Sequence, residues 1–301
     1  MKDIQYVDRS TQQVCTEEVY GRWALSLLYG RSFAARLFAF VFLPIFSRVP
    51  VISRFYGYLQ TRQRSRKKIV PFIQEYKINT AEFADPVESF HSFNDFFIRK
   101  LKPEKRPIDL GSAVAPADGR YLVVPRIGLP DAFYVKGQRF DLLSFLQDSR
   151  LAQQYCDGSM VIARLNPTDY HRFHFPVTGL LKTFRKIPGP LFSVNPWALA
   201  KRFSILWENK RALSLIQSEM FGDVLMAEIG ATCVGSIHQT HSPNARVGKG
   251  EEKGYFSFGG SSVILLFEQN RIVFEDDLIR HSSRHLETKC LMGQPLGRSR
   301  E

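Results

Sequence analysis

The sequence predicts an α+β fold, in which a helical, membrane-associating region over residues 1–70 precedes a mostly antiparallel β domain over residues 71–301. Three observations support this prediction. The first 70 residues contain 12 Lys and Arg against 4 Asp and Glu, whereas the rest of the chain carries only +4 of the net charge of +12. Apolar residues in this first part recur with helical spacing. After residue 120, short apolar runs alternate with Gly, Pro and Asn turn signals.

The first predicted helix begins near Thr16, where a capping side chain precedes two acidic residues. Val19, Trp23 and Leu27 then recur at a spacing of four and form an apolar face. The polar residues 1–15 lack the basic and apolar segments of a signal peptide.

Residues 32–53 are the most apolar part of the chain, yet the uncharged run over 37–47 has only 11 residues and contains Pro44. A helix that spans a bilayer needs about 20 apolar residues, so no transmembrane segment is expected. A further helix carries Val51, Phe55 and Leu59 and leads into a basic cluster. Such a hairpin suits the interface of an anionic membrane. The expected membrane contacts are Trp23, Phe38, Phe42, Arg62, Arg64 and Lys67.

This region has two other interpretations. It could be a helical subdomain packed on the body with a solvated basic face. It could also bind nucleic acid, but no nucleic-acid recognition motif accompanies the basic cluster, and no nucleic-acid partner is expected. The number of Phe side chains exceeds what one packing face needs, which favours the membrane.

The body of the chain predicts strands at 121–124, 160–165, 224–229, 263–267 and 272–274, with one helix over 142–154. The four cysteines are far apart and form no Cys-x-x-Cys pair, which argues against a zinc ribbon or a disulfide framework. No metal site is expected.

A Gly-Gly-Ser-Ser step joins two of the strand patterns, over residues 259–262. Glycines at such a junction let the backbone bend or approach another group closely. The Ser261 hydroxyl lies beside the unhindered carbonyl of Gly260, which it could attack. Taken alone, the step would be read as a tight turn or a bulge.

Two further segments carry groups that could act on this serine. Asp118 belongs to a Pro-Ala-Asp-Gly turn, and a turn aspartate is its ordinary interpretation. His171 and His174 lie three residues apart in a segment that ends at Pro176. No Cys or His near this pair completes a metal site.

Together these segments resemble the phosphatidylserine decarboxylase proenzymes, over roughly residues 88–301. The resemblance rests on Phe-Asn-Asp-Phe-Phe at 93–97, the Pro-Ala-Asp-Gly turn, Asp-Tyr-His-Arg-Phe-His at 169–174, Ile-Pro-Gly at 187–189, and Gly-Gln-Pro-Leu-Gly at 293–297. Gly260-Ser261 matches the family's self-cleavage site, with Ser262 where Thr is common. Val234-Gly235-Ser236 is a second Gly-Ser step, but its surroundings fit the processing position less well.

The resemblance implies self-cleavage between Gly260 and Ser261 into chains 1–260 and 261–301. Ser261 would become a pyruvoyl group, with His174 as the base and Asp118 orienting it. The pyruvoyl group would form a Schiff base with phosphatidylserine and convert it to phosphatidylethanolamine and CO2. His171 would serve as acid and base in decarboxylation, and Phe192, Ser193 and Val194 would contact the substrate. A peripheral position on the cytoplasmic face of the cell membrane follows, with a homodimer left open.

Two rivals remain at this point. Asp118, His174 and Ser261 could form the lasting triad of a membrane-associated lipid hydrolase that does not cleave itself. A membrane scaffold without enzymatic activity would need only the basic hairpin.

Overall fold

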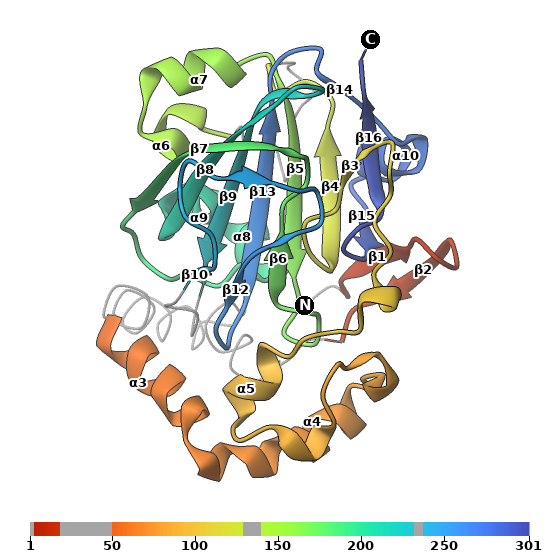
Figure 1. Ribbon diagram of the computed structural model, residues 1–301, viewed down its shortest axis with the longest axis vertical. Helices are drawn as coiled ribbons and strands as arrows, with labels where there is room; N and C mark the ends of the chain where they lie inside the picture. The colour runs from red at the N-terminus through yellow and green to blue at the C-terminus, as the bar shows by residue number, and fades with distance from the viewer. Residues whose placement is uncertain (1–2, 19–49, 129–139, 232–236, 301) are drawn as a thin grey trace.

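A computed structural model describes residues 3–18, 50–128, 140–231 and 237–300 (Figure 1). Three of the expected membrane contacts, Trp23, Phe38 and Phe42, lie outside the described residues, as do the alternative cleavage serine Ser236 and most of the helix expected after Thr16.

One large, almost entirely antiparallel sheet organises the described part of the chain. It contains ten strands in the order β11-β7-β8-β9-β13-β5-β4-β15-β1-β2, and β1 and β15 form its one parallel pair. The strands are β1 (Gln5–Asp8), β2 (Gln13–Thr16), β4 (Gly119–Val124), β5 (Ser159–Leu165), β7 (Gly179–Ile187), β8 (Arg211–Ser218), β9 (Gly222–Gly230), β11 (Arg246–Val247), β13 (Ser261–Phe267) and β15 (Glu287–Cys290).

Strand β13 lies near the middle of this sheet, between β9 and β5. All seven of its residues are buried, because both faces of the sheet are covered. A strand covered on both faces has a continuous apolar sequence, and this pattern predicted it. The strand predictions at 121–124, 160–165, 224–229, 263–267 and 272–274 are all confirmed, the last as β14 (Ile272–Phe274).

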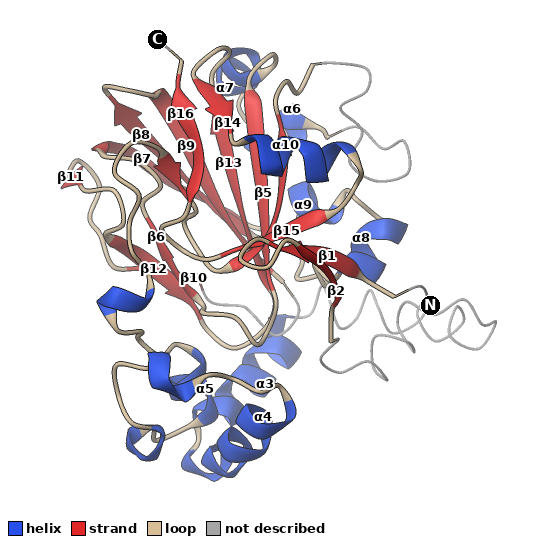
Figure 2. Cartoon of the chain, turned by 90° about the vertical axis from the view of Figure 1, so that its right-hand side faces the viewer, coloured by secondary structure: helices blue, strands red, loops and turns tan. Residues whose placement is uncertain are grey.

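Two three-stranded sheets and a helix cover one face of the large sheet (Figure 2). The first small sheet has the order β10-β12-β6 and the second β14-β16-β3, while α10 packs on β4 and β15. A cluster that includes Tyr121, Phe173, Phe256 and Val263 forms the core on this side. The elements are β3 (Ala113–Val114), β6 (Arg172–His174), β10 (Ile237–Gln239), β12 (Glu252–Phe256), β16 (Pro295–Ser299) and α10 (Asp276–Ser283).

The core on the opposite face gathers side chains of four short helices, α6 (Leu142–Leu146), α7 (Ser149–Tyr155), α8 (Pro196–Lys201) and α9 (Ile205–Glu208). The single helix predicted over 142–154 is therefore wrong. Gln147 adopts a left-handed conformation that ends α6, and the Asp148 carboxylate accepts hydrogen bonds from the first turn of α7. Apolar spacing alone could not reveal this break.

Residues 50–105 form a helical layer beyond one end of the sheets (Figures 1 and 2). It contains α3 (Pro50–Thr61), α4 (Ile69–Glu75), α5 (Phe93–Phe97) and the 3-10 turns Gln63–Lys68, Thr80–Glu82, Val87–Ser89 and Pro103–Lys105. Its core is a cluster of phenylalanine rings with Ile69, which we call the aromatic cluster: Phe72, Phe83, Phe90, Phe93, Phe96, Phe97 and, from outside the layer, Phe258. No described helix is long and apolar enough to cross a bilayer.

The prediction of a helical region over residues 1–70 is wrong for β1 and β2, which extend the large sheet. Buried Glu17 follows this strand pair and bonds the Arg164 guanidinium with two oxygens, at 2.6 and 2.9 Å. Burial alone would raise the pKa of Glu17, but Arg164 and Arg120 lower it to about 2. The first residues are thus tied to the β domain by backbone pairing and by a buried charge, neither of which has a periodic sequence signal.

Candidate functional site

Ser261 is the first residue of β13 and lies opposite Leu165 of β5 and Gly230 of β9. Its side chain is fully buried, and its Oγ has no hydrogen-bond partner among the described residues. A buried hydroxyl without a partner is unfavourable by about 1–3 kcal/mol, and the hydroxyls of Ser214 and Ser262 share this state. Gly259, two residues earlier, has a φ of 136°, which side chains other than hydrogen rarely allow.

The 257–260 turn before Ser261 is held from the helical layer. The Phe258 backbone N–H donates to Asn94 Oδ1 at 2.9 Å. The Phe258 ring packs edge-on against Phe93 and Phe97, with centroids 5.2 and 5.0 Å apart. The helical layer therefore positions the bond that precedes Ser261.

His171 lies close to this turn. Its ring stacks on Phe97 at 3.9 Å, and its Nε2 bonds the Asn166 carbonyl at 3.0 Å. Asn166 directly follows Leu165, the cross-strand partner of Ser261. Burial lowers the pKa of His171 to about 3, so the imidazole is neutral at ordinary pH. Its Nδ1 is buried and has no partner in the described part of the chain.

His174 lies three residues further on and is the last residue of β6. Its Nδ1 is 2.9 Å from the Gly250 carbonyl oxygen and its Nε2 is 3.3 Å from the Tyr170 hydroxyl. Burial lowers its pKa, although the Gly250 hydrogen bond and the Glu252 and Asp118 charges oppose that shift. A neutral imidazole can accept a proton, as a base must.

Asp118 is buried and bonded, but not to a histidine. It accepts from Arg106 Nη2 at 2.6 Å and from the Met292 backbone N–H at 2.8 Å. The His174 backbone N–H donates to the Pro116 carbonyl at 2.7 Å, which sets the two segments side by side. Among the described residues, no hydrogen bond joins Asp118 to His174 or His174 to Ser261. The structure thus gathers the predicted segments without linking their side chains.

The 192–194 loop lies on the other side of Gly260. Phe192 and Val194 are buried, and Ser193 Oγ accepts from the backbone N–H of Asn195 at 3.2 Å. A Cβ placed on Gly260 would be 3.7 Å from Val194 Cγ2, an ordinary contact distance. The loop therefore lies against Gly260.

Asn209 fixes this loop, and the sequence analysis missed it. It is fully buried, accepts from the Phe192 N–H at 3.1 Å, and donates to the Phe192 and Gly230 carbonyls at 2.8 and 2.9 Å. Gly230 is the cross-strand partner of Ser261. Asn209 belongs to no sequence motif, so only the fold reveals its position.

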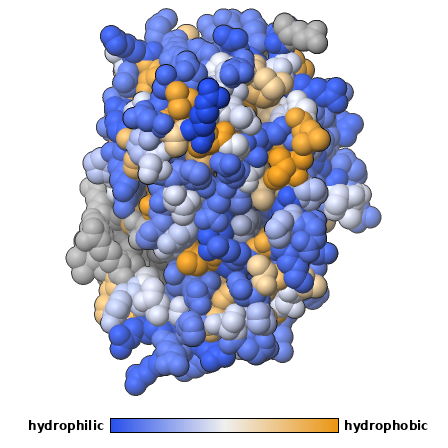
Figure 3. Space-filling view, in the orientation of Figure 1, coloured by the Kyte–Doolittle hydropathy of each residue, from blue (hydrophilic) through white to orange (hydrophobic). Residues whose placement is uncertain are grey.

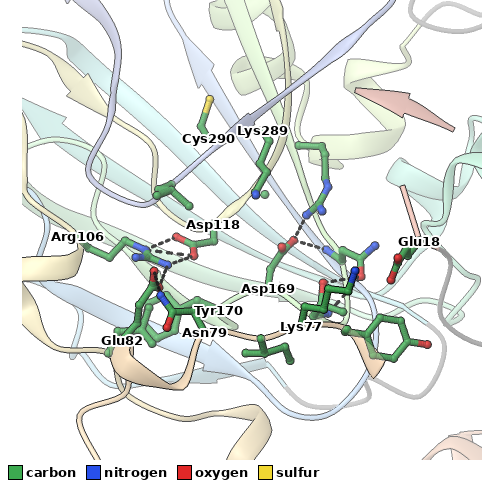
Figure 4. Close-up of a pocket in the computed structure, with 18 of the residues that line it drawn as sticks. Glu18, Lys77, Asn79, Glu82, Arg106, Asp118, Asp169, Tyr170, Lys289 and Cys290 are labelled. Atoms are coloured by element: carbon green, nitrogen blue, oxygen red, sulfur yellow. Dashed lines mark hydrogen bonds and ion pairs between the residues drawn. The ribbon is translucent and has the colours of Figure 1, made fainter. Parts of the chain in front are cut away.

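A cavity of about 450 Å³ opens between the helical layer and the end of the sheet (Figure 4). Asn79 and Glu82 line it from the helical layer, and Asp118, Asp169 and Tyr170 line it from the β domain. The dashed lines in Figure 4 show Arg106 between Asp118 and Glu82. Arg106 Nη2 bonds the Glu82 carboxylate at 3.0 Å.

Predicted membrane contacts within the described residues lie on the helical layer. Arg62, Arg64 and Lys67 are exposed, as are the apolar side chains of Phe55 and Leu59 on α3. Arg62 also donates to the Tyr58 hydroxyl at 2.8 Å. The face in Figure 3 is mostly hydrophilic, with hydrophobic side chains in small, separate groups.

Comparison with known proteins shows the family of this chain. The family model described as phosphatidylserine decarboxylase matches residues 93–298. The chain is 48% identical to the phosphatidylserine decarboxylase proenzyme of Chlamydia pneumoniae, covering 99% of this chain and 98% of that protein. It is 49% identical to that of Chlamydia caviae, covering 99% of each, and 44% identical to that of Chlamydia trachomatis serovar D, covering 99% and 98%.

The chain belongs to the phosphatidylserine decarboxylase family. The resemblance drawn from the sequence is confirmed, and the uncleaved lipid hydrolase is not favoured. The match to the family model includes Asp118, His171, His174 and Ser261 but begins after α3 and α4. The relatives nevertheless align with nearly the whole chain, so the decarboxylase family resemblance includes the helical layer.

Proposed function

We propose that this protein is a self-processing phosphatidylserine decarboxylase, a carboxy-lyase that forms phosphatidylethanolamine and CO2. Its relatives carry the name phosphatidylserine decarboxylase proenzyme. One observation carries the proposal at the level of the site. Ser261 Oγ is buried without a partner at the start of the central strand, directly after the Gly259-Gly260 step.

Self-cleavage would begin with attack of Ser261 Oγ on the Gly260 carbonyl, which moves the acyl group from nitrogen to oxygen. Loss of the Ser261 α-proton then breaks the Cβ–O bond and releases chain 1–260 as a carboxylate. Water displaces the nitrogen of the resulting dehydroalanine as ammonia, and chain 261–301 is left with a pyruvoyl group. His174 would take the hydroxyl proton and Asp118 would stabilise the imidazolium. This requires His174 to release Tyr170 or Gly250, and Asp118 to turn from Arg106.

The surroundings of residue 261 fit a pyruvoyl group, because the Ser261 Oγ is buried without a partner and Gly260 has no side chain. A pyruvoyl group supplies the carbonyl that accepts the electrons released with CO2. His171, stacked on Phe97, would take a proton from the substrate ammonium group and return it to the carbon that loses CO2. Phe192, Ser193 and Val194 would contact the substrate where Asn209 holds their loop.

The helical layer would bring the site to its lipid. Exposed Phe55 and Leu59 beside Arg62, Arg64 and Lys67 combine apolar insertion with attraction to anionic headgroups. We assign the protein to a peripheral position on the cytoplasmic face of the cell membrane.

Intact-mass spectrometry of the denatured protein tests the self-cleavage. The expected products are chain 1–260 and chain 261–301, the latter with a ketone in place of the serine amine and hydroxyl. Ser261→Ala should stay uncleaved and inactive on phosphatidylserine vesicles. Ser262→Ala removes the other partnerless buried hydroxyl of β13 and should still be cleaved. Turnover of phosphatidylserine by uncleaved Ser261→Ala would overturn the mechanism.

A further inference from the structure

Arg99 is a buried cation that contacts no carboxylate within the described residues. It lies just after α5, is 5% exposed, and donates only to backbone carbonyls. The contacts are long: 3.4 Å from Nη1 to Phe96, and 3.2 Å from Nη2 to both Thr168 and Asp169. Its Nε has no partner in the described part of the chain. A guanidinium has five N–H donors, so part of its capacity remains unused.

Two other arginines that line the cavity do contact carboxylates. Arg106 bonds the carboxylates of Asp118 and Glu82, and Arg120 pairs with Asp169 and Glu17. Burial lowers the pKa of Arg99 to about 10, which still leaves it protonated at neutral pH. The rings of Phe83 and Phe96, with centroids 5.1 and 4.9 Å from Arg99 Cζ, offset part of the cost of burying this charge. A bound anion would offset more of it.

The cavity beside Arg99 has the size and the walls of a ligand site. Its volume of about 450 Å³ lies within the range of small-molecule sites. Five basic and four acidic side chains line it, which suits a ligand that carries both signs of charge: Lys77, Arg99, Arg106, Arg120 and Lys289 against Glu18, Glu82, Asp118 and Asp169. One wall is the helical layer, which would face the membrane. The opposite wall includes Asn166, whose carbonyl bonds His171.

We propose that Arg99 binds a phosphate-type anion in this cavity, and that the anion is the phosphodiester of the lipid headgroup. The assignment to a lipid rests on the proposed function, whereas the anion site itself does not. If Arg99 bound the substrate carboxylate instead, it would stabilise the negative charge that is lost as CO2 leaves, and this would slow the reaction. A phosphodiester keeps its charge throughout the reaction, so Arg99 can anchor it without opposing the chemistry.

Titration calorimetry on full-length, uncleaved Ser261→Ala protein tests the site with two probes, inorganic phosphate and glycerophosphoserine. We expect glycerophosphoserine to bind more tightly than phosphate. Arg99→Gln should raise the dissociation constant at least about tenfold, as expected for loss of a charge-assisted hydrogen bond. Arg99→Lys keeps the charge and should lose less.

Arg211→Lys is the matched control. Arg211 is also buried and donates only to backbone carbonyls, but it lies outside the cavity. Its replacement should leave the binding of both probes unchanged. If Arg99→Gln does not fold, Arg99→Lys decides. In cleaved protein, Arg99→Lys should raise KM for a soluble short-chain phosphatidylserine while kcat is retained, which a loss of packing would not produce.

The outcomes separate this proposal from the proposed function. Binding of neither probe, or binding that is insensitive to Arg99, overturns the anion site even if phosphatidylserine is decarboxylated. Arg99-dependent binding of phosphate alone supports the anion site and overturns its assignment to the lipid. Arg99-dependent binding to the Ser261→Ala protein, with no decarboxylation of phosphatidylserine by the protein that retains Ser261, leaves the anion site standing and removes the proposed function.

Discussion

The burial of His171 makes the stability of the fold depend on pH. Its pKa is about 3 in the folded state, against 6.5 for an ordinary histidine. Between these values the unfolded chain binds a proton that the folded chain does not, so the free energy of unfolding falls as pH falls through this window. His171→Gln should reduce the slope by up to about 1.4 kcal/mol per pH unit.

Urea unfolding of Ser261→Ala protein between pH 6.5 and 5 measures this slope above the range where Glu17 titrates. His91→Gln is the control for the loss of a histidine at an exposed position. Equal slopes for all three proteins would show that His171 does not resist protonation.

Asn94 should control the rate of self-cleavage through one hydrogen bond. Its Oδ1 accepts from the Phe258 backbone N–H at 2.9 Å, two residues before Gly260. Asn94→Leu leaves that donor without a partner, at a cost of about 1–3 kcal/mol, and should slow cleavage about tenfold. Asn94→Asp retains the acceptor and should cleave at nearly the normal rate. The appearance of chain 1–260 over time on a denaturing gel gives both rates; a fast Asn94→Leu would contradict this role.

At the residue scale, the candidate reactive groups stand in motifs that the sequence displays, whereas their partners do not. Ser261, His171 and His174 stand in contiguous motifs, and the fold places their segments together. The pairing of Asp118 with Arg106 and the position of Asn209 could not be predicted. Each depends on contacts between segments that are set by the complete fold and that leave no periodic pattern.

At the scale of the element, replacement of Gly259 and replacement of Gly260, both in the turn before β13, should destabilise the protein to different extents. Gly259 has a φ of 136°, so Gly259→Ala should lower the free energy of unfolding by about 1–3 kcal/mol. Gly260→Ala adds a methyl at ordinary contact distance from Val194 and should lower it by less than about 0.5 kcal/mol. Urea unfolding of both variants in the Ser261→Ala protein compares them; a larger loss at Gly260 would contradict this assignment of strain.

Strands were easier to predict than short helices and edge strands. β5 and β13 are buried on both faces, and this burial requires the apolar runs seen in the sequence. β1 and β2 contain polar residues, and β1 joins the sheet by backbone pairing with β15. Backbone pairing requires no particular side chains, so it leaves no pattern in the sequence. The break between α6 and α7 likewise depends on one backbone conformation at Gln147.

At the scale of the whole molecule, the basic face of the helical layer should determine membrane binding. Replacement of Arg62, Arg64 and Lys67 by Glu should lower the affinity for anionic vesicles by more than about 100-fold, at roughly 1 kcal/mol for each basic residue lost. Sedimentation with vesicles at low and high salt gives the affinity and its screening. The control replaces three exposed basic residues of β7 and β11 with Glu: Lys182, Lys186 and Arg246. Equal losses in both proteins would indicate an effect of net charge alone.

The position of β13 in the sheet implies that folding would have to precede cleavage. A cut before Ser261 would leave chain 261–301 holding β13, between β9 and β5, and β15, between β4 and β1, all four neighbours belonging to the other chain. Both cores of the large sheet combine side chains of the two pieces, so neither piece could rebuild that sheet alone. The chain would have to fold first and be cut afterwards, and the cut form would survive only as long as it never unfolds. After cleavage the protein could catalyse decarboxylation but could no longer refold once it had unfolded.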